Sequence, residues 1–392
     1  MRKIPLRKVA AACIVAIGFC FVLGVYIVGL SDKNAAERDF ISYWAAGQQL
    51  ANGANPYDFQ AVRSLERAAG RPDSQALLVM RNPPVAFFLA WLLGLVGPKA
   101  GLILWLLVIL AGLSASIWIL WLLNGRPDNR FHLFGYVFAP AMACLMAAQF
   151  GIFLLVGVTL FLYLHRSRPF LAGSALLFCA LKPHLFLPFA IVMLLWSVSS
   201  KNYRILAGLS TALLASCTLS FCLDSHAWTQ YAHMMRAGGA LDEAVPTLSV
   251  SFRSLIDRNA VWLQFLPDAG ACVWALWYFW TRRDRWNWMD QGMVVLLVSA
   301  MCTPFGWFTD ESMLLPAVLA GLYRAAGSRR LLVLFGLISG VALIEVLESV
   351  QLTSPFYLWT TPAWLAWYLV ATGNKKKSTD EIGPVQRLPS TE

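Results

Sequence analysis

Residues 101–123 read GLILWLLVILAGLSASIWILWLL, and this stretch contains no charged side chain. A bilayer core of about 30 Å requires about 20 apolar residues per spanning helix, so the stretch predicts a helix that crosses a membrane. An α-helix satisfies its own backbone hydrogen bonds where no water is available. Comparable apolar stretches recur between residues 9 and 371. We therefore predict an all-α polytopic membrane protein.

The composition of the whole chain supports this class. Of 392 residues, 58% are hydrophobic and 13% are charged, whereas about a quarter of the residues of a typical soluble domain are charged. The net charge of +10 could indicate a nucleic-acid partner, but Lys and Arg stand in short clusters between apolar segments, where they set membrane topology. The predicted partner is therefore the lipid bilayer, with no nucleic acid.

The basic clusters predict that both termini are cytoplasmic. Thirteen apolar segments can be counted, but two cytoplasmic termini require an even number of crossings. We expect a bundle of about 12 transmembrane helices over residues 1–374, with one segment between 83 and 148 that is not a simple span. The first helix is predicted to be retained, and not cleaved as a signal peptide.

Three polar stretches complete the predicted organisation. Residues 31–82 form a first extracytoplasmic loop, in which residues 61–70 predict a short amphipathic helix on the membrane surface. Residues 224–257 form a second large extracytoplasmic loop. Residues 375–392 are polar without periodicity and predict a disordered cytoplasmic tail.

An acidic residue with aromatic neighbours follows the first apolar run, in residues 37–47 (ERDFISYWAAG). On a helix, Asp39 shares a face with Tyr43, and Phe40 shares one with Trp44. Aromatic rings stack on the apolar faces of sugars, and a carboxylate can take a hydroxyl proton, so this group fits a sugar site. Alternatively, the rings belong to the aromatic belt of the membrane interface and Asp39 caps the next helix.

A lysine interrupts an apolar stretch at residues 181–184 (LKPH). An ionisable residue between two apolar segments is costly to insert and is a functional candidate by default. Alternatively, Lys182 extends to the interface beside the helix-breaking Pro183. His184 either donates to the same ligand as Lys182 or fills a polar pocket.

Other polar residues lie at the same predicted membrane boundary. Arginines there can clamp a phosphate bidentately or simply mark the boundary. Acidic residues beside aromatic rings can hold sugar hydroxyls or form solvated turns. No spacing of His, Cys, Asp and Glu predicts a metal site, and no cofactor is expected. The candidates in this group are Tyr57, Asp58, Arg81, Gln149, Arg253, Trp307 and Asp310, with Glu311 next to Asp310.

Six motifs in chain order make the sequence similar to a known family. They are DFISYWAAG with GANPYD, RNPP, AAQFG, LAGSALLFCALKPH, TLSVSFRSL and TPFGWFTDESMLLP. Together they resemble glycosyltransferase family 87, a group of GT-C-type membrane enzymes. Two departures affect substrate recognition: Ala148 to Gly151 read AQFG where the family usually has Gly-Gln-x-Asn, and His184 stands where it often has Gln.

The resemblance implies a GT-C-like bundle in the bacterial plasma membrane. It implies inverting transfer of a mannose-like hexosyl sugar from a polyprenyl-phosphate donor to a glycan or glycolipid acceptor on the extracytoplasmic side. Asp39 matches the family's catalytic aspartate and would be the general base. The substrate-binding residues would be Phe40, Tyr43, Trp44, Tyr57, Asp58, Arg81, Gln149, Lys182, His184, Arg253, Trp307 and Asp310.

Two other functions fit a polytopic membrane protein. A transporter or flippase of a lipid-linked or amphipathic solute would often show internal repeats and charges near the bilayer midplane, but we find no convincing repeat, and the polar residues gather at one face. A catalytically inactive relative could serve as an assembly partner. The enzyme hypothesis requires that Asp39 and Lys182 share one extracytoplasmic cavity.

Overall fold

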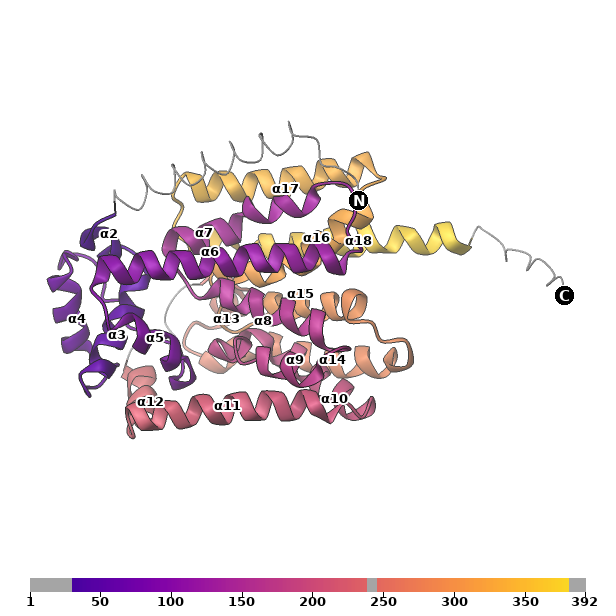
Figure 1. Cartoon of the computed structure of the whole chain (residues 1–392). Coiled ribbons are helices and arrows are strands. Elements are labelled where there is room, and N and C mark those ends of the chain that lie inside the picture. Colours follow the sequence, from indigo (N-terminus) through magenta and orange to yellow (C-terminus); the bar gives the residue numbers. More distant parts are fainter. Residues whose placement is uncertain (1–29, 238–244, 381–392) are drawn as a thin grey trace, which may run out of the picture. The chain divides into compact units, whose positions relative to one another are not determined.

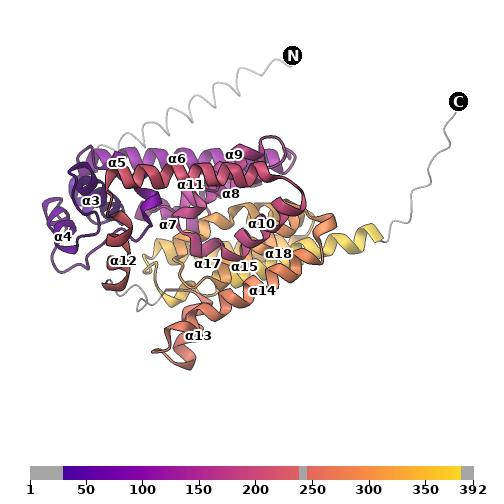
Figure 2. The same cartoon turned by 90° about the horizontal axis from the view of Figure 1, so that it is seen from below.

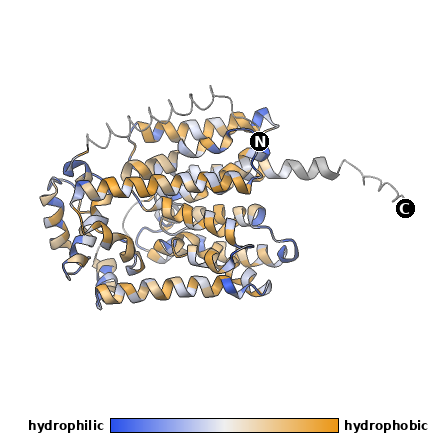
Figure 3. Cartoon of the chain, viewed as in Figure 1, coloured by the Kyte–Doolittle hydropathy of each residue, from blue (hydrophilic) through white to orange (hydrophobic). Residues whose placement is uncertain are grey.

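The computed structural model describes residues 30–237 and 245–380, with side chains up to residue 373. Within these residues every regular element is helical and no strand occurs (Figure 1). Three of the described helices are long and apolar enough to cross a membrane, namely α6 (Pro98–Leu123), α11 (Tyr203–Leu223) and α17 (Arg329–Leu347). Figure 3 shows hydrophobic residues along most of their lengths. The all-α membrane class is confirmed, whereas residues 9–29 of the predicted first helix lie outside the described residues.

Several predicted spans are shorter than a bilayer or are broken. The helix α10 (Leu187–Ser199) is preceded by two 3-10 turns, η3 (Cys179–Leu181) and η4 (Pro183–Phe186). Pro183 explains the break between these turns, because proline lacks the N–H that a continuous helix needs. The apolar helix at Pro84–Leu93 reaches only about 15 Å at 1.5 Å per residue. It is the first candidate for the segment that is not a simple span, and the number of crossings stays a prediction.

The chain divides into two compact units. The first unit contains residues 1–80 and 89–107, and the second contains residues 81–88 and 108–392. Helices of the first unit are α2 (Asp32–Ala36), α3 (Phe40–Ala51) and α4 (Phe59–Ala68), with parts of α5 (Phe87–Leu93) and α6.

The second unit contains the rest of α5 and α6 together with α11 and α17. Its remaining elements are η1 (Pro84–Ala86), η2 (Phe131–Tyr136), α7 (Ala139–Ala147), α8 (Gly151–Leu164), α9 (Pro169–Ala175), η3, η4, α10, α12 (Ala227–Ala237), α13 (Leu248–Ile256), η5 (Val261–Phe265), α14 (Leu266–Trp280), η6 (Arg283–Arg285), η7 (Trp288–Gly292), α15 (Met293–Cys302), η8 (Phe308–Leu314), α16 (Leu315–Ala325), η9 (Pro355–Tyr357) and α18 (Thr360–Asp380).

The predicted polar stretches contain helices. The amphipathic helix expected at residues 61–70 is present as α4, although its place on a membrane surface stays a prediction. The second predicted loop contains α12 and α13, with residues 238–244 outside the described part. Helix α18 extends six residues into the predicted tail, to Asp380, and residues 381–392 are not described.

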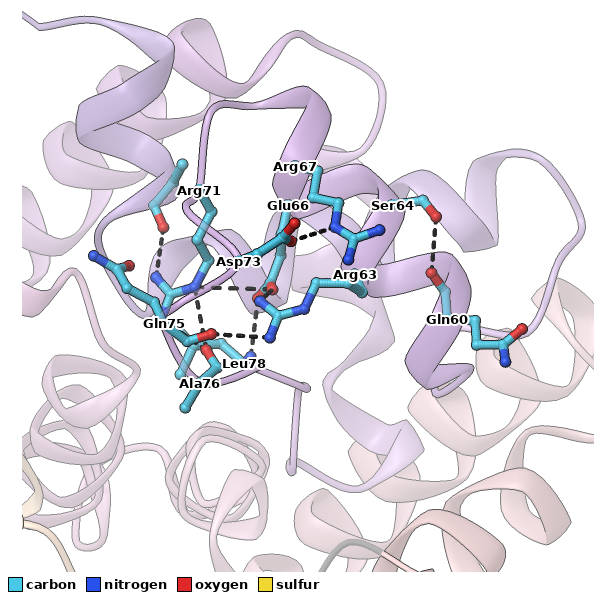
Figure 4. A network of polar contacts seen from close by, with 11 residues as sticks. Gln60, Arg63, Ser64, Glu66, Arg67, Arg71, Asp73, Gln75, Ala76 and Leu78 are labelled. Atoms are coloured by element: carbon cyan, nitrogen blue, oxygen red, sulfur yellow. Dashed lines mark hydrogen bonds and ion pairs between the residues drawn. The ribbon is translucent and has the colours of Figure 1, made fainter.

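A buried glutamate forms the centre of a network of polar contacts in the first unit (Figure 4). Glu66 of α4 is fully buried. Its Oε1 accepts the Leu78 N–H at 2.9 Å, and its Oε2 pairs with Arg63 at 3.2 Å and with Arg71 at 3.8 Å. Burial raises the pKa of Glu66, against the opposing effects of the Leu78 N–H and the two arginines. Arg71 also donates to the Ala36 carbonyl at 2.7 Å, which ties the segment after α4 to the turn that carries Asp39.

Glycine allows the backbones of α3 and α5 to approach closely in the first unit. A Cβ at Gly47 would collide with the Ala90 carbonyl oxygen and approach the Gly94 nitrogen within 2.8 Å. The Trp44 indole N–H donates to the Val96 carbonyl at 2.9 Å, and the Gln48 amide donates to the Gly94 carbonyl at 2.6 Å. Together these contacts fix α3, and with it the position of Asp39, within the first unit.

In the second unit, α9 and α11 lie side by side (Figure 2) and also meet through glycines. A Cβ at Gly173 would collide with the Ile205 carbonyl oxygen, and a Cβ at Gly208 would collide with the Phe170 carbonyl oxygen. Small residues at helix contacts are characteristic of membrane bundles, because they let backbones approach. The Ser174 hydroxyl, which contacts the Gly208 carbonyl at 3.2 Å, adds a polar contact to this interface.

We expect the substitution Gly173→Ala to destabilise the protein by about 1–3 kcal/mol, because the added methyl group must displace the α11 backbone. The matched control is Gly336→Ala in α17, where a Cβ would meet no atom within 4 Å. Thermal unfolding in detergent micelles should show a lower midpoint for Gly173→Ala and no loss for the control. Equal midpoints for Gly173→Ala and wild type would contradict the close packing of α9 and α11.

Candidate functional site

Lys182 and Asp310 form an ion pair in the second unit. Lys182 lies between η3 and η4, where Pro183 interrupts the helix. Its ammonium donates to Asp310 Oδ1 at 2.7 Å, and the two side chains are 16% and 3% exposed. The second carboxylate oxygen of Asp310 accepts the Trp307 backbone N–H at 3.1 Å. Both oxygens of Asp310 are therefore engaged, and this carboxylate fixes the position of the lysine.

Gln149 joins the same cluster from the break between α7 and α8. Ala148 ends α7 in the left-handed region, with φ 54°. Gln149 is buried, and its Oε1 accepts the Thr309 hydroxyl at 2.8 Å. Because Thr309 directly precedes Asp310, three residues predicted from separate motifs, Gln149, Lys182 and Asp310, lie around η8.

The RNPP motif lies beside Lys182 as well. The buried Asn82 side chain donates to the carbonyl of Leu181 at 2.9 Å. Helix α11 holds the next residues of the motif, because the Ser220 hydroxyl contacts the Pro84 carbonyl at 2.6 Å. The Tyr231 hydroxyl donates a hydrogen bond to the backbone carbonyl of Arg81 at 3.4 Å. Asn82 was not among the predicted site residues. The RNPP motif that contains it was the only feature of the sequence that could have indicated its place in the site.

His184 and Arg253 also belong to the second unit. His184 has Lys182 and Asp310 among its electrostatic neighbours, and its carbonyl accepts the Thr303 hydroxyl at 3.1 Å. Arg253 donates to Gln264 Oε1 at 3.0 Å and to the Arg258 carbonyl at 2.7 Å. These bonds tie α13 to the segment that follows it, and a role for Arg253 in phosphate binding stays a prediction.

Glu311 differs from its neighbour Asp310. Glu311 Oε1 accepts the hydroxyls of Thr360 and Thr361 at 2.6 and 2.8 Å. Its Oε2 is buried and has no hydrogen-bond partner among the described residues. Asp310, Glu311 and Trp307 line a pocket together with Thr247, Thr303 and Thr361.

Asp39 belongs to the first unit, where it precedes α3. It stands at the N-cap position, but its side chain makes no capping hydrogen bond, and the residue is half-buried. Helix capping therefore does not explain this carboxylate. Since Lys182 belongs to the second unit, a cavity shared by Asp39 and Lys182 stays a prediction.

The aromatic residues near Asp39 have packing contacts within the first unit. Phe40, Tyr43 and Trp44 are buried, and the Tyr43 ring lies 5.7 Å from that of Trp105. Tyr57 is buried too. The substrate-binding roles of these four residues stay predictions.

Asp58 has a structural role in the first unit. It is exposed and precedes α4. Its Oδ1 accepts the N–H groups of Gln60 and Ala61 at 2.8 and 2.9 Å, which caps the helix. This capping agrees with the turn interpretation of the NPYD motif, and substrate binding by Asp58 stays a prediction.

The comparisons with known proteins identify the class and then the family. The described residues contain no cluster of three or more His, Cys, Asp or Glu that could hold a metal ion. With its apolar helices and a lysine–carboxylate cluster at helix breaks, the chain is a multi-pass membrane glycosyltransferase. The model of glycosyltransferase family 87 matches residues 81–304, more than half of the sequence, and the chain belongs to this family. Neither the curated proteins nor the solved structures gave a match.

Proposed function

We propose that this glycosyltransferase transfers a mannose-like hexosyl group from a polyprenyl-phosphate donor to a glycan or glycolipid acceptor, on the extracytoplasmic side of a bacterial plasma membrane. The observation that carries the proposal is the Lys182 ammonium, which the ion pair with Asp310 holds at a helix break. The neighbouring hydrogen bond between Thr309 and Gln149 extends this polar cluster into the bundle.

Lys182 is suited to bind the phosphate of the donor. A lysine ammonium has three N–H donors, and Asp310 uses one of them. The side chain is 16% exposed, and we expect the donor phosphate to bind the remaining N–H groups. As the bond between sugar and phosphate breaks, negative charge develops on the leaving phosphate, and a fixed cation stabilises that charge.

Asp39 would act as the general base. The acceptor hydroxyl oxygen attacks the anomeric carbon and its proton moves to the Asp39 carboxylate. The bond from the anomeric carbon to the phosphate oxygen breaks at the same time, and the polyprenyl phosphate leaves with the electron pair. A single displacement of this kind inverts the configuration of the anomeric carbon.

Reconstitution tests this proposal directly. The full chain in lipid nanodiscs would be incubated with polyprenyl-phosphate mannose, polyprenyl-phosphate glucose or nucleotide sugars, and with glycolipids extracted from bacterial membranes as acceptors. We expect mass spectrometry to detect a hexose added to an acceptor, with inverted configuration, from a polyprenyl-phosphate donor only. Transfer from nucleotide sugars would disprove the donor class. Movement of a lipid-linked sugar across liposomes without any transfer would instead support a flippase.

A further inference from the structure

Two adjacent carboxylates in η8 have different hydrogen bonding. Asp310 uses one oxygen for Lys182 and the other for the Trp307 N–H. Glu311 uses Oε1 for two threonine hydroxyls, and its Oε2 has no partner within the described part of the chain. A buried acceptor without a partner is rare in folded proteins and calls for an explanation.

The residues around Glu311 indicate which kind of ligand group can bind its Oε2. The residue is 7% exposed and lines the pocket described above. Lys182, the cation of the cluster, is already paired with Asp310, and the described residues include no ion-pair partner of Glu311. Glu311 offers no positive charge to a phosphate, whereas its Oε2 can accept a hydrogen bond from a hydroxyl.

The other residues of the pocket suit a sugar. The half-buried Trp307 is one of the residues that line the pocket, and aromatic side chains combine an apolar face with polar surroundings in such sites. The Thr247 hydroxyl lines the pocket and accepts the Val250 N–H at 3.2 Å, and within the described part of the chain no hydrogen bond donated by it is recorded. The pocket therefore combines a ring, a donor and an acceptor, which is the set that a neutral polyhydroxyl ring requires.

We propose that Glu311 Oε2 accepts a hydrogen bond from a hydroxyl of a hexose bound at the mouth of this pocket, with that hydroxyl reaching into it. Lys182, held in place by Asp310, then binds the phosphate, and Glu311 binds the sugar. This division of roles rests on the proposed sugar transfer, and it makes Glu311 a specificity residue for the sugar-bearing substrate.

Ligand-observed saturation-transfer NMR on the full chain in nanodiscs tests this assignment. The probes are the methyl glycosides of mannose, glucose and galactose, with inorganic phosphate as a competitor that should not displace them. The test variant is Glu311→Gln, which keeps an oxygen for Thr360 and Thr361 but replaces the acceptor Oε2 by an amide donor. The matched control is Glu345→Gln, since Glu345 also has an unpartnered Oε2 but does not line the pocket.

We expect Glu311→Gln to weaken binding of the preferred glycoside by roughly 2- to 10-fold, the range for a lost hydrogen bond, and the control to leave it unchanged. A second measurement uses the wild-type protein and a series of glycosides that each lack one hydroxyl. The glycoside that lacks the hydroxyl bound by Glu311 should bind to wild type about as weakly as the complete glycoside binds to Glu311→Gln. Unchanged binding by Glu311→Gln, equal binding of all deoxy analogues, or no glycoside binding by wild type would each overturn the assignment.

The outcomes separate this inference from the proposed function. If the protein transfers sugar but Glu311→Gln neither weakens glycoside binding nor raises KM, the assignment of Glu311 alone is wrong. If glycosides bind through Glu311 but no sugar is transferred from any polyprenyl-phosphate donor, the transfer reaction is wrong and the sugar site stands.

Discussion

Sugar transfer by the Asp39→Asn variant is expected to be about 100- to 10,000-fold slower than by wild type, the range for loss of a general base. Asparagine has nearly the same shape as aspartate but takes no proton from the attacking hydroxyl at neutral pH. The thermal unfolding midpoint is measured alongside, so that a loss of folded protein is separated from a loss of chemistry. The measurement is the single-turnover rate with saturating polyprenyl-phosphate sugar in nanodiscs.

The matched control for Asp39 is Asp58→Asn in the same unit. Asp58 is also an acidic residue directly before a helix, but its Oδ1 accepts the N–H groups of Gln60 and Ala61. Asparagine is an equally good N-cap, so this variant should keep its stability, and it is the control for the effect on folding of removing an acidic residue before a helix. Equal rates for Asp39→Asn and wild type would remove Asp39 from the chemistry and leave the family assignment untouched.

The sequence predicted the fold class because transmembrane helices are determined by a local property, the length of an apolar run. The stretch at residues 101–123 appears in the structure as α6. The sequence also predicted one helix break, since Pro183 stands at an interruption between two short helical turns. It could not predict how many helices cross completely, because short broken helices and spanning helices have the same composition.

The site could be predicted in part. Gln149, Lys182 and Asp310 were all expected, and the structure brings them together around η8. Their partners come from distant positions: Gln149 bonds to Thr309 across 160 residues. The sequence does not indicate which carboxylate oxygen is already satisfied. Glu311 was therefore set beside Asp310 as an equivalent acid, whereas the hydroxyls of Thr360 and Thr361 leave only its Oε2 open.

Removal of the Lys182 charge should affect both stability and activity. The Lys182→Met variant leaves Asp310 buried without its cation, and breaking a buried pair on one side costs about 3–5 kcal/mol. We expect the lower end of this range, because Lys182 is 16% exposed. Transfer should fall about 100- to 1,000-fold, the range for loss of one fixed group that stabilises a developing charge.

A second substitution separates these two effects. In Lys182→Met/Asp310→Asn neither substituted position carries a charge, and the asparagine side-chain oxygen can still accept the Trp307 N–H. Replacement of both members of a buried ion pair is often close to neutral for stability, so the unfolding midpoint of the double variant should return toward wild type. The transfer rate should stay low, because the double variant still lacks the Lys182 ammonium that binds the phosphate, even where its stability is restored. If transfer recovers together with stability, Lys182 only supports the fold around η8, and the phosphate must be bound by another cation of the chain.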